Sequence, residues 1–192
     1  DYVYFLNDGT RVREFGDKES GYFSELTTNN SIIMVIKVFS NSGNIMNKYP
    51  AIKGSECPLG IQYDFDEKGK MIKETDLDEP YKLTIEDILQ FLKKNNANFE
   101  RYYSINRSFD EATKKGTWSL DYFGAYKNKQ GNYLIEIDDK TNEIQYVAKI
   151  TGKEGEKEIL KNTKKETLLI DEDNSKKNNT LIIIILLFLA LF

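Results

Sequence analysis

Hydrophobic and polar positions alternate in short runs along the first 80 residues, and glycine-centred turns separate these runs. One pattern occurs three times, in residues 5–14, 39–48 and 65–74: an aromatic residue lies four positions before a glycine, and an apolar residue lies three positions after it. Glycine readily adopts the positive φ of a tight turn, and the flanking apolar residues can pair across two strands. The pattern predicts a hairpin-repeat β region over residues 1–80. Within it, residues 31–39 (SIIMVIKVF) predict a central strand that is apolar on both faces.

The hydrophobic period changes from two to about 3.6 residues after position 82. Four apolar residues recur at helical spacing: Ile85, Ile88, Leu89 and Leu92. Thr84 can cap this helix, because the acidic Asp87 follows three residues later, and Asn95 can end it. The pattern predicts the main helix of the chain over residues 84–95.

Alternating strands follow this helix after a second, weaker helical signal. Residues 109–115, closed by Gly116, are predicted to form a short helix. Residues 117–126, 132–138 and 143–150 carry alternating apolar side chains, with turns expected at 128–131 and 138–142. This pattern predicts an antiparallel, three-stranded meander over residues 117–150.

These elements together predict an α+β fold of antiparallel hairpins, one main packed helix (about 84–95) and a second, three-stranded meander (about 117–150). The hairpin-repeat region (residues 1–80) and the helix with its meander (residues 81–151) are expected to pack as one domain, because about 150 residues is an ordinary domain size. Residues 152–180 are rich in Lys, Glu and Asn and predict a charged flexible tether, with a short helix in 153–164.

The chain ends in an unbroken apolar run that predicts a membrane-directed tail. Its residues are Leu181, Ile182, Ile183, Ile184, Ile185, Leu186, Leu187, Phe188, Leu189, Ala190, Leu191 and Phe192. A helix of this length rises roughly 18 Å, whereas the hydrocarbon core of a bilayer is about 30 Å thick. The tail is therefore interpreted as a truncated span, a processing signal or a partly inserted anchor. Because the chain begins at Asp1 rather than at Met, it is either a mature form or a fragment.

Three interpretations are open for the side of the membrane on which the folded part of the chain lies. Lys176 and Lys177 precede the tail and favour a cytoplasmic, tail-anchored protein under the positive-inside rule. Residues 173–175 could instead be the attachment site of a lipid anchor after cleavage of the tail, although the spacer to the tail is short. The third reading, an exported envelope protein, comes from the resemblance described below.

Composition excludes several kinds of chemistry. The net charge of -4 and the pI of about 5.1 argue against a nucleic-acid partner. The absence of histidine removes Ser-His-Asp and Cys-His nucleophile systems and His-containing zinc sites, and the single Cys57 allows neither an intrachain disulfide nor a thiolate cluster. Phosphate-binding glycine loops are also absent. We therefore predict no cofactor, no metal and no enzymatic activity.

Carboxylates and aromatic residues are the remaining candidates for a site. Residues 64–69 begin like a calcium loop, but Lys68 and Thr75 stand where ligands are needed, so a charged hairpin turn is preferred. Asp138 and Asp139 are interpreted as turn acids, while a glycosidase-like carboxylate pair elsewhere stays open. Five aromatic residues are either core packing against the helix or a partner-binding face: Tyr102, Tyr103, Trp118, Tyr122 and Tyr126.

Two segments resemble known families. Residues 60–74 (GIQYDFDEKGKMIKE), and the hairpins at 40–75 more generally, resemble the variant MORN-type repeats of bacterial envelope proteins. Residues 131–144 (GNYLIEIDDKTNEI) are similar to the hairpin of PepSY-type domains, with Asn142 where Gly is usual. The resemblance implies an exported, non-catalytic binding or inhibitory module and brings no catalytic residues to this chain.

These observations favour a non-enzymatic, membrane-tethered binding protein of the cell envelope or surface, such as an inhibitor or immunity-type factor, with a protein partner. A carboxylate-dependent surface hydrolase and a structural coat protein are the alternatives. The oligomeric state is left open by the sequence.

Overall fold

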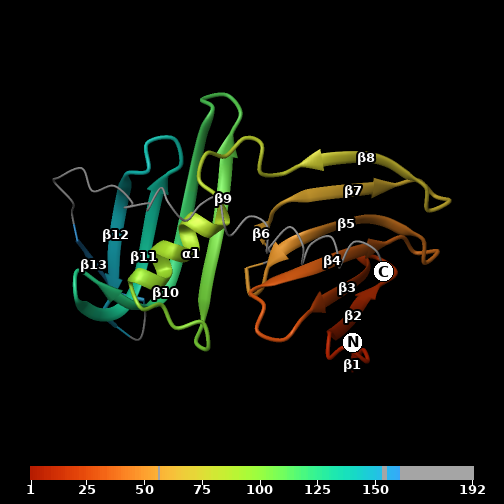
Figure 1. Ribbon diagram of the computed structural model, residues 1–192, viewed down its shortest axis with the longest axis horizontal. Helices are drawn as coiled ribbons and strands as arrows, with labels where there is room; N and C mark the ends of the chain where they lie inside the picture. The colour runs from red at the N-terminus through yellow and green to blue at the C-terminus, as the bar shows by residue number, and fades with distance from the viewer. Residues whose placement is uncertain (56, 153–154, 161–192) are drawn as a thin grey trace. The chain divides into compact units, whose positions relative to one another are not determined.

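The computed structural model describes residues 1–55, 57–152 and 155–160. The chain divides into two compact units, Asp1–Glu79 and Pro80–Phe192, and each is built on an antiparallel sheet (Figure 1). The boundary lies close to the change of hydrophobic period after residue 82. The expectation that the two regions pack as one domain stays a prediction.

The first unit is an antiparallel meander in the order β1-β2-β3-β4-β5-β7-β8, with the short β6 also paired to β5. Strand β4 lies at its centre, as expected from the run of apolar residues. The strands are β1 (Tyr2–Phe5), β2 (Arg11–Asp17), β3 (Gly21–Thr27), β4 (Ile33–Phe39), β5 (Ile45–Ile52), β6 (Cys57–Pro58), β7 (Ile61–Phe65) and β8 (Met71–Asp76).

The three repeated glycine patterns form three turns of the same kind. In each turn the first residue donates its N–H to the carbonyl of the fifth, and the glycine at the fourth position donates to the carbonyl of the first. The glycines have φ of +83°, +83° and +76°. This combination is a three-residue hairpin loop whose last residue requires the left-handed conformation. The turns span residues 6–10, 40–44 and 66–70.

The core of the first unit lies on both faces of β4. Met34 and Ile36 pack with Ala51 on one face, where the half-buried Val38 and Tyr49 extend the cluster. On the other face, alternate residues are equally buried: Val12, Val35 and Ile52 are each at most 5% exposed.

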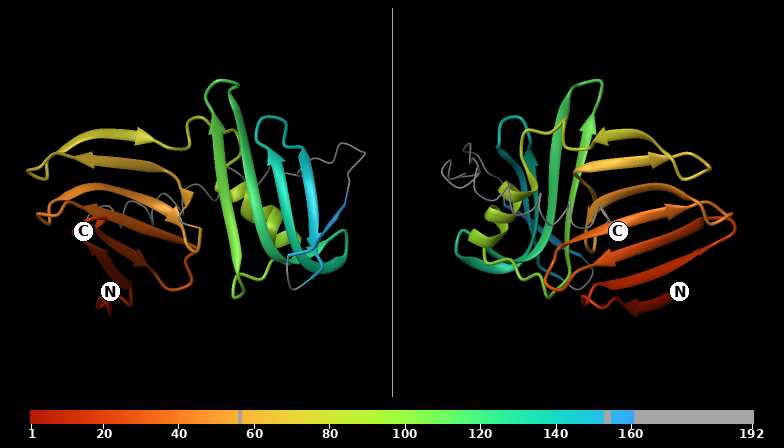
Figure 2. Two further views of the ribbon diagram at one scale, coloured as in Figure 1. Left: turned by 180° about the vertical axis from the view of Figure 1, so that it is seen from behind. Right: turned by 45° about the vertical axis from the view of Figure 1, so that its right-hand side comes forward.

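In its described residues, the second unit has one helix and five strands, in the order β13-β12-β11-β10-β9. Helix α1 lies across one face of this sheet (Figures 1 and 2). The elements are α1 (Ile85–Lys94), β9 (Tyr103–Asp110), β10 (Lys115–Tyr126), β11 (Lys129–Asp138), β12 (Ile144–Ile150) and β13 (Lys157–Ile159). Thr84 caps α1 as the sequence predicts: its side chain accepts from the Asp87 N–H, and the Asp87 carboxylate accepts from the Thr84 N–H.

Every second residue of β10 is buried, which defines the core face of the second sheet. Trp118, Leu120 and Tyr122 are at most 2% exposed. The apolar stripe of α1 is buried to the same degree, with Ile88 at 0% and Leu92 at 1%. The helix periodicity and the strand alternation therefore mark the buried positions of this unit.

The predicted α+β fold class is wrong. Among the described residues, strands make up 55% and helix only 6%, so this part of the chain is β-rich, with two antiparallel sheets and one short helix. The meander expected at 117–150 is part of a five-stranded sheet, because β9 and β13 add a strand on either side of it. Strand β9 was not predicted, because polar residues such as Asn106 and Ser108 interrupt the alternation of apolar side chains along it.

The second helix, expected at residues 109–115, is a hairpin turn between β9 and β10. The Asp110 carboxylate accepts hydrogen bonds from the Ala112 and Thr113 N–H groups, and Lys114 takes the left-handed conformation with φ of +53°. An acid that caps a turn has the same short-range signature as a helix start. Gly116 belongs to β10 and does not end a helix.

Two further boundaries differ from the expected ones. The turn predicted at 128–131 is a two-residue turn of Lys127 and Asn128, both with positive φ, and Gly131 lies within β11. The helix predicted in 153–164 is replaced by strand β13 where the chain is described, and β13 pairs with β12. Asn142 does adopt the positive φ, +60°, that its place in the turn suggested.

Candidate binding surfaces

The five aromatic residues singled out in the sequence lie in two different environments. Trp118, Tyr122 and Tyr126 are 0%, 1% and 4% exposed and belong to the core of the second unit. Tyr103 is half-buried at the start of β9, edge-to-face with Phe99 at 5.1 Å between ring centroids, and Tyr102 is 73% exposed. The structure therefore places three of the five side chains inside the fold and leaves Tyr102 on its surface.

Asp139 is a buried carboxylate, 3% exposed, that joins the segment before α1 to the sheet. Its Oδ2 accepts from the Lys82 N–H at 2.8 Å, and its Oδ1 accepts from the Leu83 N–H at 2.9 Å and from the Trp118 Nε1–H at 3.2 Å. A Cβ at Gly116 would lie 2.8 Å from the Asp139 Cβ, so glycine is needed there. The sequence suggested only a turn acid, because these donors are more than 20 positions away.

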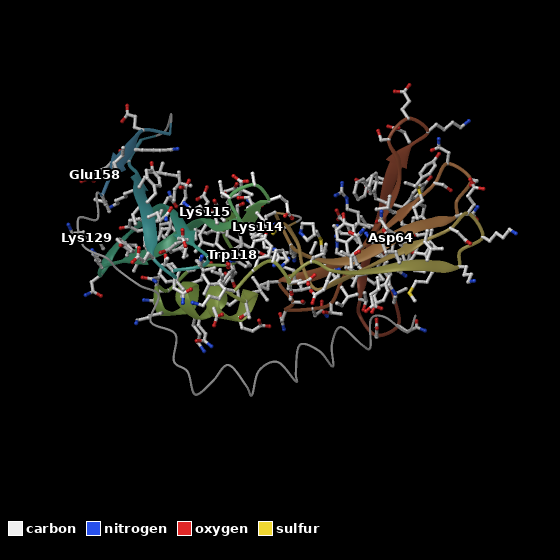
Figure 3. The ribbon with its side chains drawn as sticks, turned by 90° about the horizontal axis from the view of Figure 1, so that it is seen from above. Asp64, Lys114, Lys115, Trp118, Lys129 and Glu158 are labelled. Atoms are coloured by element: carbon white, nitrogen blue, oxygen red, sulfur yellow. The ribbon has the colours of Figure 1, made fainter. Side chains whose placement is uncertain are left out.

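Asp138 organises the neighbouring turn. It accepts from the Thr141 N–H at 2.9 Å and from Gln145 Nε2 at 2.9 Å. The Nζ of Lys115, a residue labelled in Figure 3, lies 3.7 Å from the Oδ2 of Asp138. Burial raises the pKa of Asp138, but the bonds from Thr141 and the charge of Lys115 outweigh it and hold this pKa below its usual value. Both acids of the pair therefore stabilise local structure.

The calcium-like segment 64–69 is a hairpin turn. Asp66 Oδ1 accepts from the Lys68 and Lys70 N–H groups, both at 2.9 Å, and Asp64 Oδ1 accepts from Gln62 Nε2. Among the described residues, no group of three or more His, Cys, Asp or Glu side chains is placed to hold a metal ion. Cys57 is buried in β6.

A row of seven directly opposed residues crosses the first sheet from one edge to the other. Each member pairs with the next across neighbouring strands, so all share one face. We call it the lysine row: Tyr2, Glu14, Ser24, Lys37, Lys48, Tyr63 and Glu74. Sequence reasoning missed the row, because strand register brings together residues that lie far apart in the chain.

Two positive charges oppose each other at the centre of the lysine row. Lys37 and Lys48 are both half-buried, and Lys48 Nζ lies 5.5 Å from the centroid of the Tyr63 ring. Burial lowers the pKa of Lys48, and the charge of Lys37 lowers it further. Like charges directly opposite each other destabilise a sheet. The acids of the row stand further out, and Glu14 accepts from the Tyr4 hydroxyl at 3.0 Å.

One carboxylate on the second sheet has a raised pKa. Asp121 alternates with the core residues of β10 and so lies on the face away from α1. Burial raises its pKa, and Lys157 opposes this shift. Glu136 pairs with Ser119, two residues along the strand from Asp121, and so lies on the same face. The hydrolase alternative requires two carboxylates that face one another in a cleft, and these two share a face without pairing directly.

The apolar tail, residues 181–192, lies outside the described residues. In the described ranges no helix is long and apolar enough to cross a membrane. Comparisons with protein-family models, with curated proteins and with solved structures find no match to this chain.

Proposed function

We propose that this chain is a non-enzymatic binding protein of the cell envelope, tethered to a membrane by its apolar tail, and that it binds an acidic group of a protein partner on the lysine row. The observation that carries the proposal is the direct opposition of Lys37 and Lys48 at the centre of a sheet face. An anion bound beside the two ammonium groups accepts charge-assisted hydrogen bonds from them.

The neighbours of the two lysines define the kind of ligand. Tyr63 places an aromatic ring beside Lys48, and the small, buried Ser24 stands beside Lys37. Glu14 and Glu74 lie further along the row, so positive charge is confined to its centre. This arrangement fits a carboxylate side chain presented by a protein surface, rather than a long polyanion, which needs an extended basic stripe.

The tether and the envelope location rest on the sequence. In this proposal the part of the predicted charged tether that follows β13 links the folded units to the membrane, and the resemblance of the hairpins to envelope repeats favours export. Within this proposal the protein acts as an inhibitor or immunity-type factor, because such proteins work by occupying a partner's surface.

A hexaglutamate peptide tests the lysine row, using calorimetric titration of the full chain in detergent. We expect binding that weakens with added salt. Lys37→Gln and Lys48→Gln should each weaken it by roughly tenfold or more, since a hydrogen bond to a charged group contributes about 1.5–3 kcal/mol. Lys73→Gln is the matched control, because Lys73 pairs with Asp64 and so lies on the opposite face. Equal losses in all three variants, or none, would contradict the proposal.

The natural partner can be sought with the same variants. Solubilised membranes are passed over the immobilised wild-type chain and over the Lys37→Gln/Lys48→Gln double variant. A stoichiometric protein retained by the first and lost by the second supports the proposal. Recovery of no stoichiometric partner on the wild-type chain counts heavily against a binding role.

One alternative, a carboxylate-dependent hydrolase, rests on the shared sheet face of Asp121 and Glu136, and the raised pKa of Asp121 is consistent with it. A carboxyl that keeps its proton to higher pH can act as a general acid, with Glu136 as the second carboxylate. Hydrolysis of glycan or peptide substrates that is lost in Asp121→Asn would support this alternative over the binding role.

A further inference from the structure

Strand β1 and the residue after it expose apolar side chains on both faces of the first sheet. Strand β1 is the end strand of its sheet and pairs with β2 alone among the described strands. A run of five exposed residues on one edge is unusual for a folded surface. The residues, which we call the β1 edge, are Tyr2 (76% exposed), Val3 (51%), Tyr4 (43%), Phe5 (66%) and Leu6 (43%).

The other three sheet edges carry charged residues that discourage strand addition. Strand β8 ends the first sheet, and β9 and β13 end the second. Their charged residues are Lys73, Glu74 and Asp76 in β8, Arg107 and Asp110 in β9, and Lys157 and Glu158 in β13. The β1 edge contains no charged residue, so it lacks the feature that protects the others.

The backbone of the β1 edge is set to accept another strand. Leu6 donates its N–H to the Thr10 carbonyl, and because hydrogen-bonded positions alternate in an antiparallel ladder, the N–H and C=O of Tyr4 also face β2. The same groups of Val3 and Phe5 therefore point away from β2, toward the outer side of the strand.

We propose that the β1 edge pairs in antiparallel fashion with the β1 edge of a second copy of this chain. A two-fold axis perpendicular to the sheet can place Tyr4 opposite Tyr4 of the second copy, Val3 opposite Phe5, and Tyr2 opposite Leu6. Val3 and Phe5, whose backbone groups point outward, then form the hydrogen-bonded pairs, and every opposed pair is apolar or aromatic. Pairing with β8 of another copy would instead set these residues against Lys73 and Glu74 and build an open filament.

The exposed area indicates how strong this pairing is. A buried aromatic side chain covers about 150–250 Å², so three exposed aromatics with a valine and a leucine offer on the order of 400 Å² per copy. The total, about 800 Å², is below the roughly 1,200–2,000 Å² of stable interfaces. We therefore expect a weak dimer in solution that is strengthened when the copies share a membrane, because tethering raises their effective concentration.

The dimer has a consequence for the lysine row, although the pairing does not depend on it. An axis perpendicular to the sheet keeps equivalent faces on the same side, so two copies present two lysine rows in one direction. A partner with two acidic groups then gains avidity from the second site.

Disulfide trapping tests the pairing and its register. In a Cys57→Ser background of the full chain in detergent, Tyr4→Cys should form a covalent dimer on mild oxidation, because non-hydrogen-bonded opposed residues have Cα atoms about 4.5 Å apart. Tyr102→Cys, at a more exposed tyrosine of the second unit, is the control and should stay largely monomeric. Equal trapping at both positions would overturn the proposal.

A charge at the same position gives an independent test. Fluorescence energy transfer between labelled copies of the full chain in liposomes should be abolished by Tyr4→Lys. Tyr102→Lys should preserve it. Tyr4 contacts Glu14, so a lysine there is compatible with the fold, and an unchanged melting temperature checks this. Energy transfer that survives Tyr4→Lys overturns the pairing. A wild-type chain that stays monomeric and instead binds a strand of another protein at β1 overturns it as well. The lysine-row titration is unaffected by either result, so failure of one proposal leaves the other standing.

Discussion

Two residues, Asp139 and Gly116, join the segment before α1 to the sheet of the second unit. Asp139 satisfies two backbone N–H groups before α1 and the indole of Trp118, and Gly116 leaves the space that its carboxylate occupies. A buried carboxylate surrounded by donors is favourable only while every donor keeps its acceptor. Asp139 therefore joins the segment before α1 to the sheet, in addition to the burial of Ile88 and Leu92 in the core.

Replacing Asp139 by Ala should lower the free energy of unfolding of the second unit by about 2–4 kcal/mol, because three donors lose their acceptor. Asp139→Asn retains one acceptor oxygen and should cost less. Trp118 is the only tryptophan and lies in this core, so its fluorescence during urea unfolding reports on this unit. Equal stability of the alanine variant and the wild type would show that the three bonds contribute nothing.

Lys48 illustrates a different case, a residue whose charged form is disfavoured by its surroundings in the folded state. Its pKa is lowered by burial and by Lys37, so below that pKa the charged form destabilises the folded state. Lys48→Met should therefore raise the melting temperature by a few degrees at neutral pH while removing hexaglutamate binding. Lys73→Met, on the other face and opposite Asp64, should show no such gain. A lower melting temperature for Lys48→Met would mean that its charge stabilises the fold.

Hairpin turns are the elements that repeat. The three turns of the first unit share one hydrogen-bonding pattern and one left-handed glycine, although their other residues differ. A Cβ at Gly43 or Gly69 would meet no atom within 4 Å. Glycine is required at these two positions by backbone conformation alone.

Gly43→Ala should cost about 1–2 kcal/mol, the strain of a left-handed alanine. Gly43→Asn should cost less, because asparagine tolerates this conformation, as Asn142 does at φ of +60°. Urea unfolding of the two variants measures the difference. If both variants lose the same stability, the glycine requirement has another origin than φ.

At the scale of the whole molecule, both units contain turn carboxylates whose pKa values are lowered. Asp8 accepts from the Thr10 N–H, Asp17 from the Ser20 and Glu19 N–H groups, and Asp110 from the Thr113 and Ala112 N–H groups. Hydrogen bonds to the ionised form lower each of these pKa values from the ordinary 3.8. Both units contain such turns.

Acid should therefore destabilise both units. A carboxyl with a folded pKa below its unfolded pKa contributes stability that is fully present above the unfolded value and is lost as pH falls through the folded one. We expect melting temperatures to fall as pH drops below about 4. Asp17→Asn keeps an acceptor oxygen but cannot titrate, so its melting temperature should fall less steeply in this range. A slope identical to that of the wild type would exclude Asp17 as a contributor.

The amino-acid sequence by itself determined the features that depend on neighbours a few positions apart. Turn glycines need a positive φ whatever surrounds them, Thr84 and Asp87 cap a helix within one turn, and alternation along β10 separates its buried face from its open face. Each of these signals is local, so it can be read without knowing the fold.

Only the tertiary structure decided the features that depend on strand register. The turn acid Asp110 has a helix-like local signature, and its pairing with Lys115 made the segment a hairpin. Burial of Trp118 and Tyr122 required a helix from another part of the chain, and the opposition of Lys37 and Lys48 required two strands to align. The exposure of the β1 edge likewise follows from its place at the end of the sheet, because contacts between distant segments determine which strands are covered.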